Sequence, residues 1–141
     1  MKRIRITKAM LEAHGACSVE VEVFAHTWPK GAVVSLVNLR RAAELGLDLG
    51  WFAAGFLTGS AKKEFYAGTA PATRAYSKET APSLRVYKAA VASEEHQVAR
   101  VSAWRVYYAE TRPAWQVFCA ARAAVLWKVI QAHGLRGVEP S

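Results

Sequence analysis

The spacing of hydrophobic positions in the first sixty residues changes every few residues, and most changes coincide with a capping or turn residue. Arg3-Ile4-Arg5-Ile6 alternates polar and apolar side chains, which predicts a half-exposed strand. Thr7 then provides an N-cap for a helix over Lys8–His14, and Gly15 provides a left-handed stop. Gly31-Ala32-Val33-Val34 is short, β-branched and bounded by turn formers, so we expect it to pair with the first strand.

Three further helices are predicted in the same way. Ser18 is the expected cap of a helix that ends at Trp28, before a proline. Ser35 is the expected cap of a helix that stops at Gly46, and Asp48 that of a helix containing several aromatic residues. Residues 1–59 are therefore predicted to form a compact helical module with a short β pair.

The rest of the chain is organised by an eleven-residue repeat. Tyr76-Ser-Lys-Glu-Thr-Ala-Pro82 follows a similar segment that begins at Phe65, and the pattern returns as Tyr107-Tyr-Ala-Glu-Thr-Arg-Pro113 after a two-residue slip. Eleven residues make about three helical turns, so each copy presents the same helical face. The predicted apolar stripe consists of Tyr76, Thr80, Leu84, Tyr87, Val91, Val98, Val101, Tyr108, Trp115, Phe118, Val125 and Val129.

The polar segment Ser93-Glu94-Glu95-His96-Gln97 falls where the repeat slips, which predicts a turn between two helices. The fold class is then mainly α: an N-terminal helical array with two short paired strands, followed by long proline-kinked helices packed as an antiparallel pair. We expect residues 60–134 to form this repeat region, as part of the same structural unit or closely packed on it, and residues 135–141 to be a flexible tail.

The prolines of the repeat admit two interpretations. Pro71, Pro82 and Pro113 each remove a backbone donor, and their recurrence at the helical repeat would bend a continuous helix in one direction. Alternatively, the threonine two residues before each proline is an N-cap, and the region is broken into stacked short helices. The pattern alone leaves both open.

Composition and charge restrict the class of protein and partner. A hydrophobic fraction of 52% with five Trp, five Tyr and five Phe excludes general disorder. The net charge is +8: residues 1–59 have seven Lys/Arg and five Asp/Glu, a balance of +2, whereas residues 60–141 have twelve and six, a balance of +6. Such an excess attracts polyanions, so nucleic acids and acidic proteins are candidate partners.

The same features give an expected location. Neither a leading hydrophobic segment after Met1 nor an apolar run of membrane-spanning length is present, so we expect a cytoplasmic protein without a membrane partner. Amphipathic eleven-residue repeats also suit lipid surfaces, but the stripe includes Thr80 and the N-terminal module competes for it. Cys17 and Cys119 are expected to be buried, reduced thiols.

Candidate catalytic chemistry is sparse. His14, His26, His96 and His133 are isolated, and none has metal-ligand spacing to a Cys, His, Asp or Glu. Gly55 and Gly59 before Ser60-Ala61-Lys62 do not have the spacing of a phosphate loop. We therefore expect no enzymatic activity, no catalytic residues, no cofactor and no metal site.

The repeat region has one constellation with a binding rationale, in which cations alternate with aromatic residues. Such a surface can hold phosphates while rings stack on bases, or can anchor a protein partner through Trp, Tyr and Arg side chains. The alternative is that the basic stems only cover the edges of an apolar seam. The candidate partner-binding residues are Arg74, Arg85, Arg100, Trp104, Arg105, Tyr108, Arg112 and Trp115.

The first 57 residues also show a resemblance to a known kind of protein. The segments Ile6-Thr7-Lys8, Gly15-Ala16-Cys17, Trp28-Pro29, Arg41-Ala42-Ala43 and Gly46-Leu47-Asp48, with Leu11, Phe24, Asn38 and Trp51, are similar to a short helical module of small phage and bacterial proteins, some of them labelled immunity proteins. The later tyrosine and Ala-Pro repeats resemble tails that follow such modules. These matches lie at core and capping positions, so the resemblance implies a phage or mobile-element origin and assigns no functional residue.

Together these observations predict a non-enzymatic helical binding protein. Its expected partner is a host protein or nucleoprotein complex that it occludes or modulates, for example as an inhibitor of a defence system such as an anti-CRISPR. The alternative function is sequence-nonspecific binding of nucleic acid by the basic C-terminal helices. A long aromatic stripe also makes a homodimer a candidate assembly.

Overall fold

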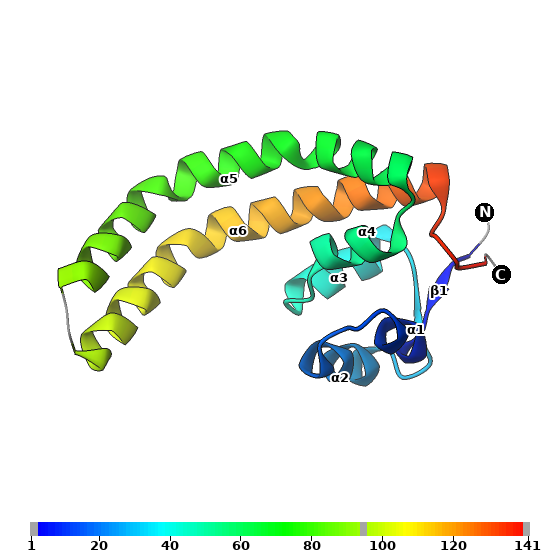
Figure 1. Ribbon diagram of the computed structural model, residues 1–141, viewed down its shortest axis with the longest axis horizontal. Helices are drawn as coiled ribbons and strands as arrows, with labels where there is room; N and C mark the ends of the chain where they lie inside the picture. The colour runs from blue at the N-terminus through cyan, green and yellow to red at the C-terminus, as the bar shows by residue number, and fades with distance from the viewer. Residues whose placement is uncertain (1–2, 94–95, 140–141) are drawn as a thin grey trace. The chain divides into compact units, whose positions relative to one another are not determined.

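The computed structural model describes residues 3–93 and 96–139, and the chain divides into two compact units. The first unit comprises Met1–Thr69 with Cys119–Ser141, and the second unit is Ala70–Phe118. Two long helices, α5 (Gly59–Ser93) and α6 (Gln97–His133), run through both units (Figure 1). The expected fold class is confirmed: the chain is mainly helical, with a short β pair near the N-terminus and two long C-terminal helices packed against each other.

The β pair and the first helix form as the sequence predicts. Strand β1 (Arg5–Ile6) pairs antiparallel with β2 (Ala32–Val33), with Arg5 opposite Val33. Helix α1 (Lys8–Ala13) follows β1, and the Thr7 hydroxyl accepts a hydrogen bond from the Met10 N–H at 3.3 Å. These elements follow from local capping and alternation, which need no distant partner to be recognised.

Three short helices complete the N-terminal array: α2 (Ser18–Thr27), α3 (Leu36–Glu44) and α4 (Leu49–Phe56). Ser35 caps α3 by accepting from the Asn38 N–H, and Asp48 caps α4 by accepting from the Trp51 N–H, as expected. The prediction for Ser18 is wrong by one residue. Cys17 occupies the cap position without a side-chain hydrogen bond, because the helix already includes Ser18.

The core of the first unit combines residues that are distant in sequence. Phe56, Leu57 and Leu126 are its largest fully buried side chains, and Phe65 and Ile130 are buried in the same cluster. Because the ends of both long helices contribute to this core, the unit does not stop at the expected boundary between residues 59 and 60.

The segment after α6 is packed where a flexible tail was expected from residue 135. Leu135 is buried in the core cluster and forms a β-bridge with Val138. The Arg136 N–H donates to the Phe56 carbonyl at 2.6 Å. An apolar side chain that enters the core outweighs the polar composition around it, so residues 135–139 make packing contacts in this structure, and residues 140–141 lie outside the described part.

In the second unit, α5 and α6 lie side by side and antiparallel (Figure 1). The rings of Tyr76 and Phe118 are 5.3 Å apart between centroids, and those of Tyr87 and Tyr107 are also 5.3 Å apart. The expected turn is consistent with the end of α5 at Ser93 and the start of α6 at Gln97, although Glu94 and Glu95 lie outside the described residues.

The prolines do not break the helices, because α5 continues through Pro71 and Pro82, and α6 through Pro113. The threonines before them are buried mid-helix residues, not N-caps. The hydroxyls of Thr80 and Thr111 donate to the carbonyls of the residues four positions earlier, at 2.8 and 2.9 Å. Such back-bonding satisfies the hydroxyl inside a helix and is associated with helix bending.

The predicted apolar stripe is correct on α5 and at Phe118, Val125 and Val129 of α6, but it is misplaced over residues 98–115 of α6. Val98, Val101, Tyr108 and Trp115 are exposed, whereas Thr111 and Ala114 are buried. Small side chains occupy the centre of the seam because they let two helix backbones approach closely, and larger rings fit only beside them. The pattern was read from the large apolar residues and therefore selected the flank of the seam on α6.

Candidate binding surface

The exposed aromatic residues of the second unit form a row along α6. Trp104, Tyr108 and Arg112 follow one another at intervals of four residues, which places them on neighbouring turns. The Trp104 and Tyr108 centroids are 6.4 Å apart. The Arg112 guanidinium carbon lies 5.6 Å from the Tyr108 ring centroid, and Arg112 Nη1 donates to Tyr108 Oη at 3.2 Å. The row is thus a connected series of rings ending in a cation.

Each exposed ring of this row, and Trp115 beyond it, retains a large accessible surface. The exposed fractions are 48% for Trp104, 50% for Tyr108 and 43% for Trp115. The inner parts of the two tryptophans pack on rings of α5: Trp104 on Tyr87 at 5.7 Å and Trp115 on Tyr76 at 5.6 Å. The rings are therefore held by the seam while half of their surface faces solvent, an arrangement that reduces the entropy cost of binding.

One hydrogen bond between α5 and α6 fixes which sides of the two helices lie together. Ser83 Oγ donates to Glu110 Oε2 at 2.8 Å, so these two residues share one flank of the helix pair. Glu79 precedes Ser83 by one turn and belongs to the same flank. Each residue advances about 100° around a helix, so Arg85 lies about 200° around α5 from Ser83. On α6, Tyr108 and Arg112 each lie about 200° from Glu110.

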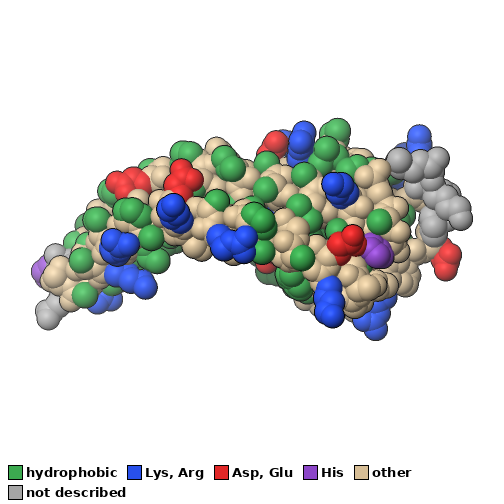
Figure 2. All heavy atoms as spheres, turned by 90° about the horizontal axis from the view of Figure 1, so that it is seen from above, with side chains coloured by type: hydrophobic (Ala, Val, Ile, Leu, Met, Phe, Trp, Pro, Cys, Tyr) green, Lys and Arg blue, Asp and Glu red, His purple; other side chains and the backbone are tan. Residues whose placement is uncertain are grey.

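The cations and the aromatic row consequently occupy the side away from this acidic flank. On α5, Arg74, Lys78 and Lys88 are each about 140° or more from Ser83. Figure 2 agrees, since the acidic side chains of the helix pair lie along one edge and the Lys and Arg side chains along the opposite edge. We name this side the basic–aromatic face; it comprises Arg74, Lys78, Arg85, Lys88, Trp104, Arg105, Tyr108, Arg112 and Trp115.

The structure places all eight sequence-predicted site residues in the second unit, and all eight are exposed. Seven of them belong to the basic–aromatic face. Arg100 lies only about 80° from Glu110 around α6 and is therefore separated from the others. Lys78 and Lys88, which the sequence shows beside Arg74 and Arg85, belong to the face although they were not among the predicted site residues.

Two histidines of the first unit make structural contacts. The His14 ring stacks on Phe56 at 4.1 Å, and its Nδ1 lies 3.0 Å from the Met10 carbonyl oxygen. His133, in the last turn of α6, pairs with Glu64. These contacts give both histidines a structural role in the first unit.

The two cysteines are free, but neither is buried as expected. Cys17 is exposed because it precedes the first turn of α2, and Cys119 is half-buried. Burial raises the pKa of the Cys119 thiol, the charge of Arg122 opposes this shift, and Asp48 adds to it. Arg122 and Asp48 form an ion pair at 3.2 Å, so the thiol lies near a charge pair that largely compensates itself.

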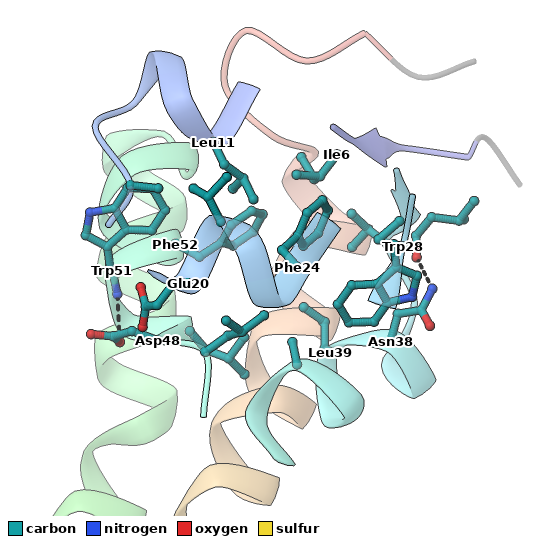
Figure 3. A pocket seen from close by; sticks show the side chains of 18 residues that line it. Ile6, Leu11, Glu20, Phe24, Trp28, Asn38, Leu39, Asp48, Trp51 and Phe52 are labelled. Atoms are coloured by element: carbon teal, nitrogen blue, oxygen red, sulfur yellow. Dashed lines mark hydrogen bonds between the residues drawn. The ribbon is translucent and has the colours of Figure 1, made fainter. Parts of the chain in front are cut away.

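The first unit also contains an apolar pocket of about 90 Å³ (Figure 3). Its walls include aromatic side chains of α2 and α4, among them Phe24, Trp51 and Phe52, and Trp28 at the end of α2. Glu20 and Asp48 also line it. Sequence reasoning missed this pocket, because its wall residues have the same apolar spacing as ordinary core residues.

Within residues 3–93 and 96–139, no three His, Cys, Asp or Glu side chains gather in a way that could hold a metal ion. Over the same described ranges, no helix combines the length and the apolar character needed to cross a membrane. Comparison with models of protein families, with curated proteins and with solved structures found no match.

Proposed function

We propose that this chain is a non-enzymatic binding protein that docks through its basic–aromatic face onto a host protein or nucleoprotein complex and occludes it. The observation that carries the proposal is the separation of charge in the second unit: six Lys/Arg side chains accompany three half-exposed rings, while Glu79 and Glu110 lie on the opposite flank. Trp, Tyr and Arg are the residue types that dominate binding energy at protein interfaces.

The proposal includes a biological setting that rests on the resemblance of the first 57 residues alone. Small proteins of phages and mobile elements often act by blocking host machinery, so the proposed role is that of an inhibitor, with a defence system as the example target. This biological setting is supported by context alone, whereas the docking face is supported by the residues of α5 and α6.

Site-specific photo-crosslinking tests the docking face directly. A photoreactive phenylalanine replaces Tyr108, and in a matched control it replaces Tyr66, a first-unit tyrosine with a similar exposed fraction of 53%. In cells of the native host, the probe at Tyr108 is expected to capture a discrete partner that the probe at Tyr66 does not. Arg112→Ala is expected to weaken that capture, because the Arg112 guanidinium lies over the ring at position 108 and its removal takes a cation away from the docking face.

Two crosslinking results would contradict this proposal. If both probe positions give the same adducts, or if neither gives any, the basic–aromatic face is not a docking surface. Trp104→Ala and Trp115→Ala would then be expected to alter stability without altering activity in the host, since both rings also pack on α5.

A second candidate function, sequence-tolerant binding of nucleic acid, is favoured by the absence of Asp and Glu from the basic–aromatic face among the described residues. If its six cations contact phosphates of a single strand, the logarithm of affinity should fall with the logarithm of salt concentration with a slope of about −4. Arg85→Gln should reduce that slope by about 0.7, whereas Arg40→Gln on α3 should leave it unchanged. No binding of an oligonucleotide at low salt would exclude this function and leave the protein-docking proposal intact.

A further inference from the structure

The apolar pocket of the first unit is partly open to solvent and can therefore admit a small molecule from outside. The pocket measures about 90 Å³, roughly three times the share of liquid volume that a water molecule occupies. Its walls come from the N-terminal helices and the second strand, including Phe24, Trp28, Leu39 and Phe52. An apolar ligand of a few carbon atoms would therefore contact apolar side chains on several sides.

One end of the pocket has a different chemistry. Figure 3 shows Glu20, Asp48 and Trp51 at this end. Asp48 is already engaged, because its carboxylate accepts a hydrogen bond from the backbone N–H of Trp51 and forms an ion pair with Arg122. Within residues 3–93 and 96–139, the half-buried Glu20 carboxylate has neither a hydrogen bond nor an ion pair. A carboxylate without a partner among the described residues thus lines the same end of the pocket as the Trp51 side chain, in a chain whose net charge is +8.

A carboxylate next to an indole matches the recognition chemistry of an ammonium group. The carboxylate supplies charge, and the face of a tryptophan attracts cations through its quadrupole. We propose that the pocket binds a small organic cation with an apolar body, an alkylammonium of about four carbons, with the carbon chain between Phe24 and Phe52 and the ammonium beside Glu20 and Trp51. This site lies in the first unit and does not depend on the function proposed for the basic–aromatic face.

Glu20 also has a local role that must be separated from ligand binding. It lies in the first turn of α2, where a negative charge stabilises the helix N-terminus, and Cys17 provides no side-chain cap there. That role accounts for an acid at this position, but it accounts neither for the apolar walls nor for the tryptophan. The test therefore compares Glu20→Gln with Glu22→Gln, an exposed acid on the same helix that does not line the pocket.

The probes are n-butylammonium, its neutral counterpart n-butanol and the anion n-butyrate, added to the full chain while NMR follows the indole N–H signals of Trp28 and Trp51. We expect n-butylammonium to shift both signals with millimolar affinity, and to bind about five-fold more tightly than n-butanol. Glu20→Gln should remove most of this five-fold preference, and Glu22→Gln should leave it unchanged. Ala42→Leu, which adds volume to a lining residue, should weaken all binding.

Three results would overturn the proposal: equal binding of n-butanol and n-butylammonium by the unaltered chain, equal losses in Glu20→Gln and Glu22→Gln, or no shift of either indole signal by any probe. Nα-acetyl-lysine amide distinguishes the source of the cation. If Nα-acetyl-lysine amide binds as tightly as n-butylammonium, the natural ligand is a lysine side chain of a peptide. If it binds more weakly, the natural ligand is a free amine. Either result supports an alkylammonium site.

Discussion

Gly68 on α5 offers a sharp test of how closely the two long helices approach each other in the first unit. A Cβ atom added at this position would lie 2.7 Å from Cγ1 of Val125 on α6. The optimal separation of two carbon atoms is about 3.5–4.0 Å, so the shortfall is about 1 Å. Val125 is β-branched and stiff about χ1 in a helix, so its methyl group cannot turn away at low cost.

Two opposing terms determine the effect of Gly68→Ala. Alanine gains about 1 kcal/mol over glycine in a helix interior, whereas overpacking typically costs about 1–3 kcal/mol. We expect a net loss of about 1 kcal/mol in the free energy of unfolding. Gly55→Ala on α4 is the matched control, because its added Cβ would meet His14 at an ordinary 3.6 Å. That variant should gain about 0.5–1 kcal/mol.

Urea unfolding followed by far-ultraviolet circular dichroism measures both variants, with the midpoint compared at constant slope. A double-mutant cycle with Val125→Ala tests the cause, since removing the valine methyls should relieve the overlap and recover about 1 kcal/mol of coupling. The reasoning fails if Gly68→Ala stabilises the chain as much as Gly55→Ala, or if Val125→Ala costs the same in both backgrounds.

Two further predictions concern the prolines and the cysteines. Pro82 is exposed inside α5. Pro82→Ala should therefore raise the thermal midpoint, with a gain of up to about 3 kcal/mol in the free energy of unfolding. A lower midpoint would mean that the packing of α5 requires the proline. Because the pKa of Cys119 is raised, its alkylation rate should reach half-maximum at a higher pH in the folded chain than in the urea-unfolded chain. Asp48→Asn, which preserves an N-cap, should lower that pH in the folded chain. The raised pKa also favours the neutral thiol in the folded state, so this contribution to stability is present below the unfolded pKa and is lost as pH rises through the alkaline range. Identical alkylation profiles for Cys119 in the folded and the urea-unfolded chain would contradict the burial of Cys119.

The elements predicted best from sequence are those specified by adjacent residues. Ser35 and Asp48 form the expected caps because an N-cap needs only a short side chain and the backbone N–H a few residues later. The seam was placed incorrectly over residues 98–115 of α6 because its centre there is made of Thr111 and Ala114, and small residues give little signal in a pattern of large hydrophobic ones.

The candidate binding surface was predictable in composition but not in geometry. The sequence contains Arg105, Arg112 and Tyr108 at helical spacing, but whether acids alternate with them depends on how α5 and α6 align. The hydrogen bond between Ser83 and Glu110 sets that alignment. It joins residues 27 positions apart, a relation that no local pattern contains. The pocket was not predictable for a similar reason, since a gap between walls is a property of packing and not of any wall residue.

The eleven-residue period makes the length of the helix pair adjustable in fixed steps. Thr69 and Thr80 on α5 are both buried and are separated by one period. Inserting one further repeat into α5 and one into α6 would extend each helix by about 16 Å while returning every following side chain to nearly the same orientation. A single insertion would instead leave one helix without a neighbour over that length. Chains that carry more copies of this repeat should therefore gain them in pairs, one on each side of the turn.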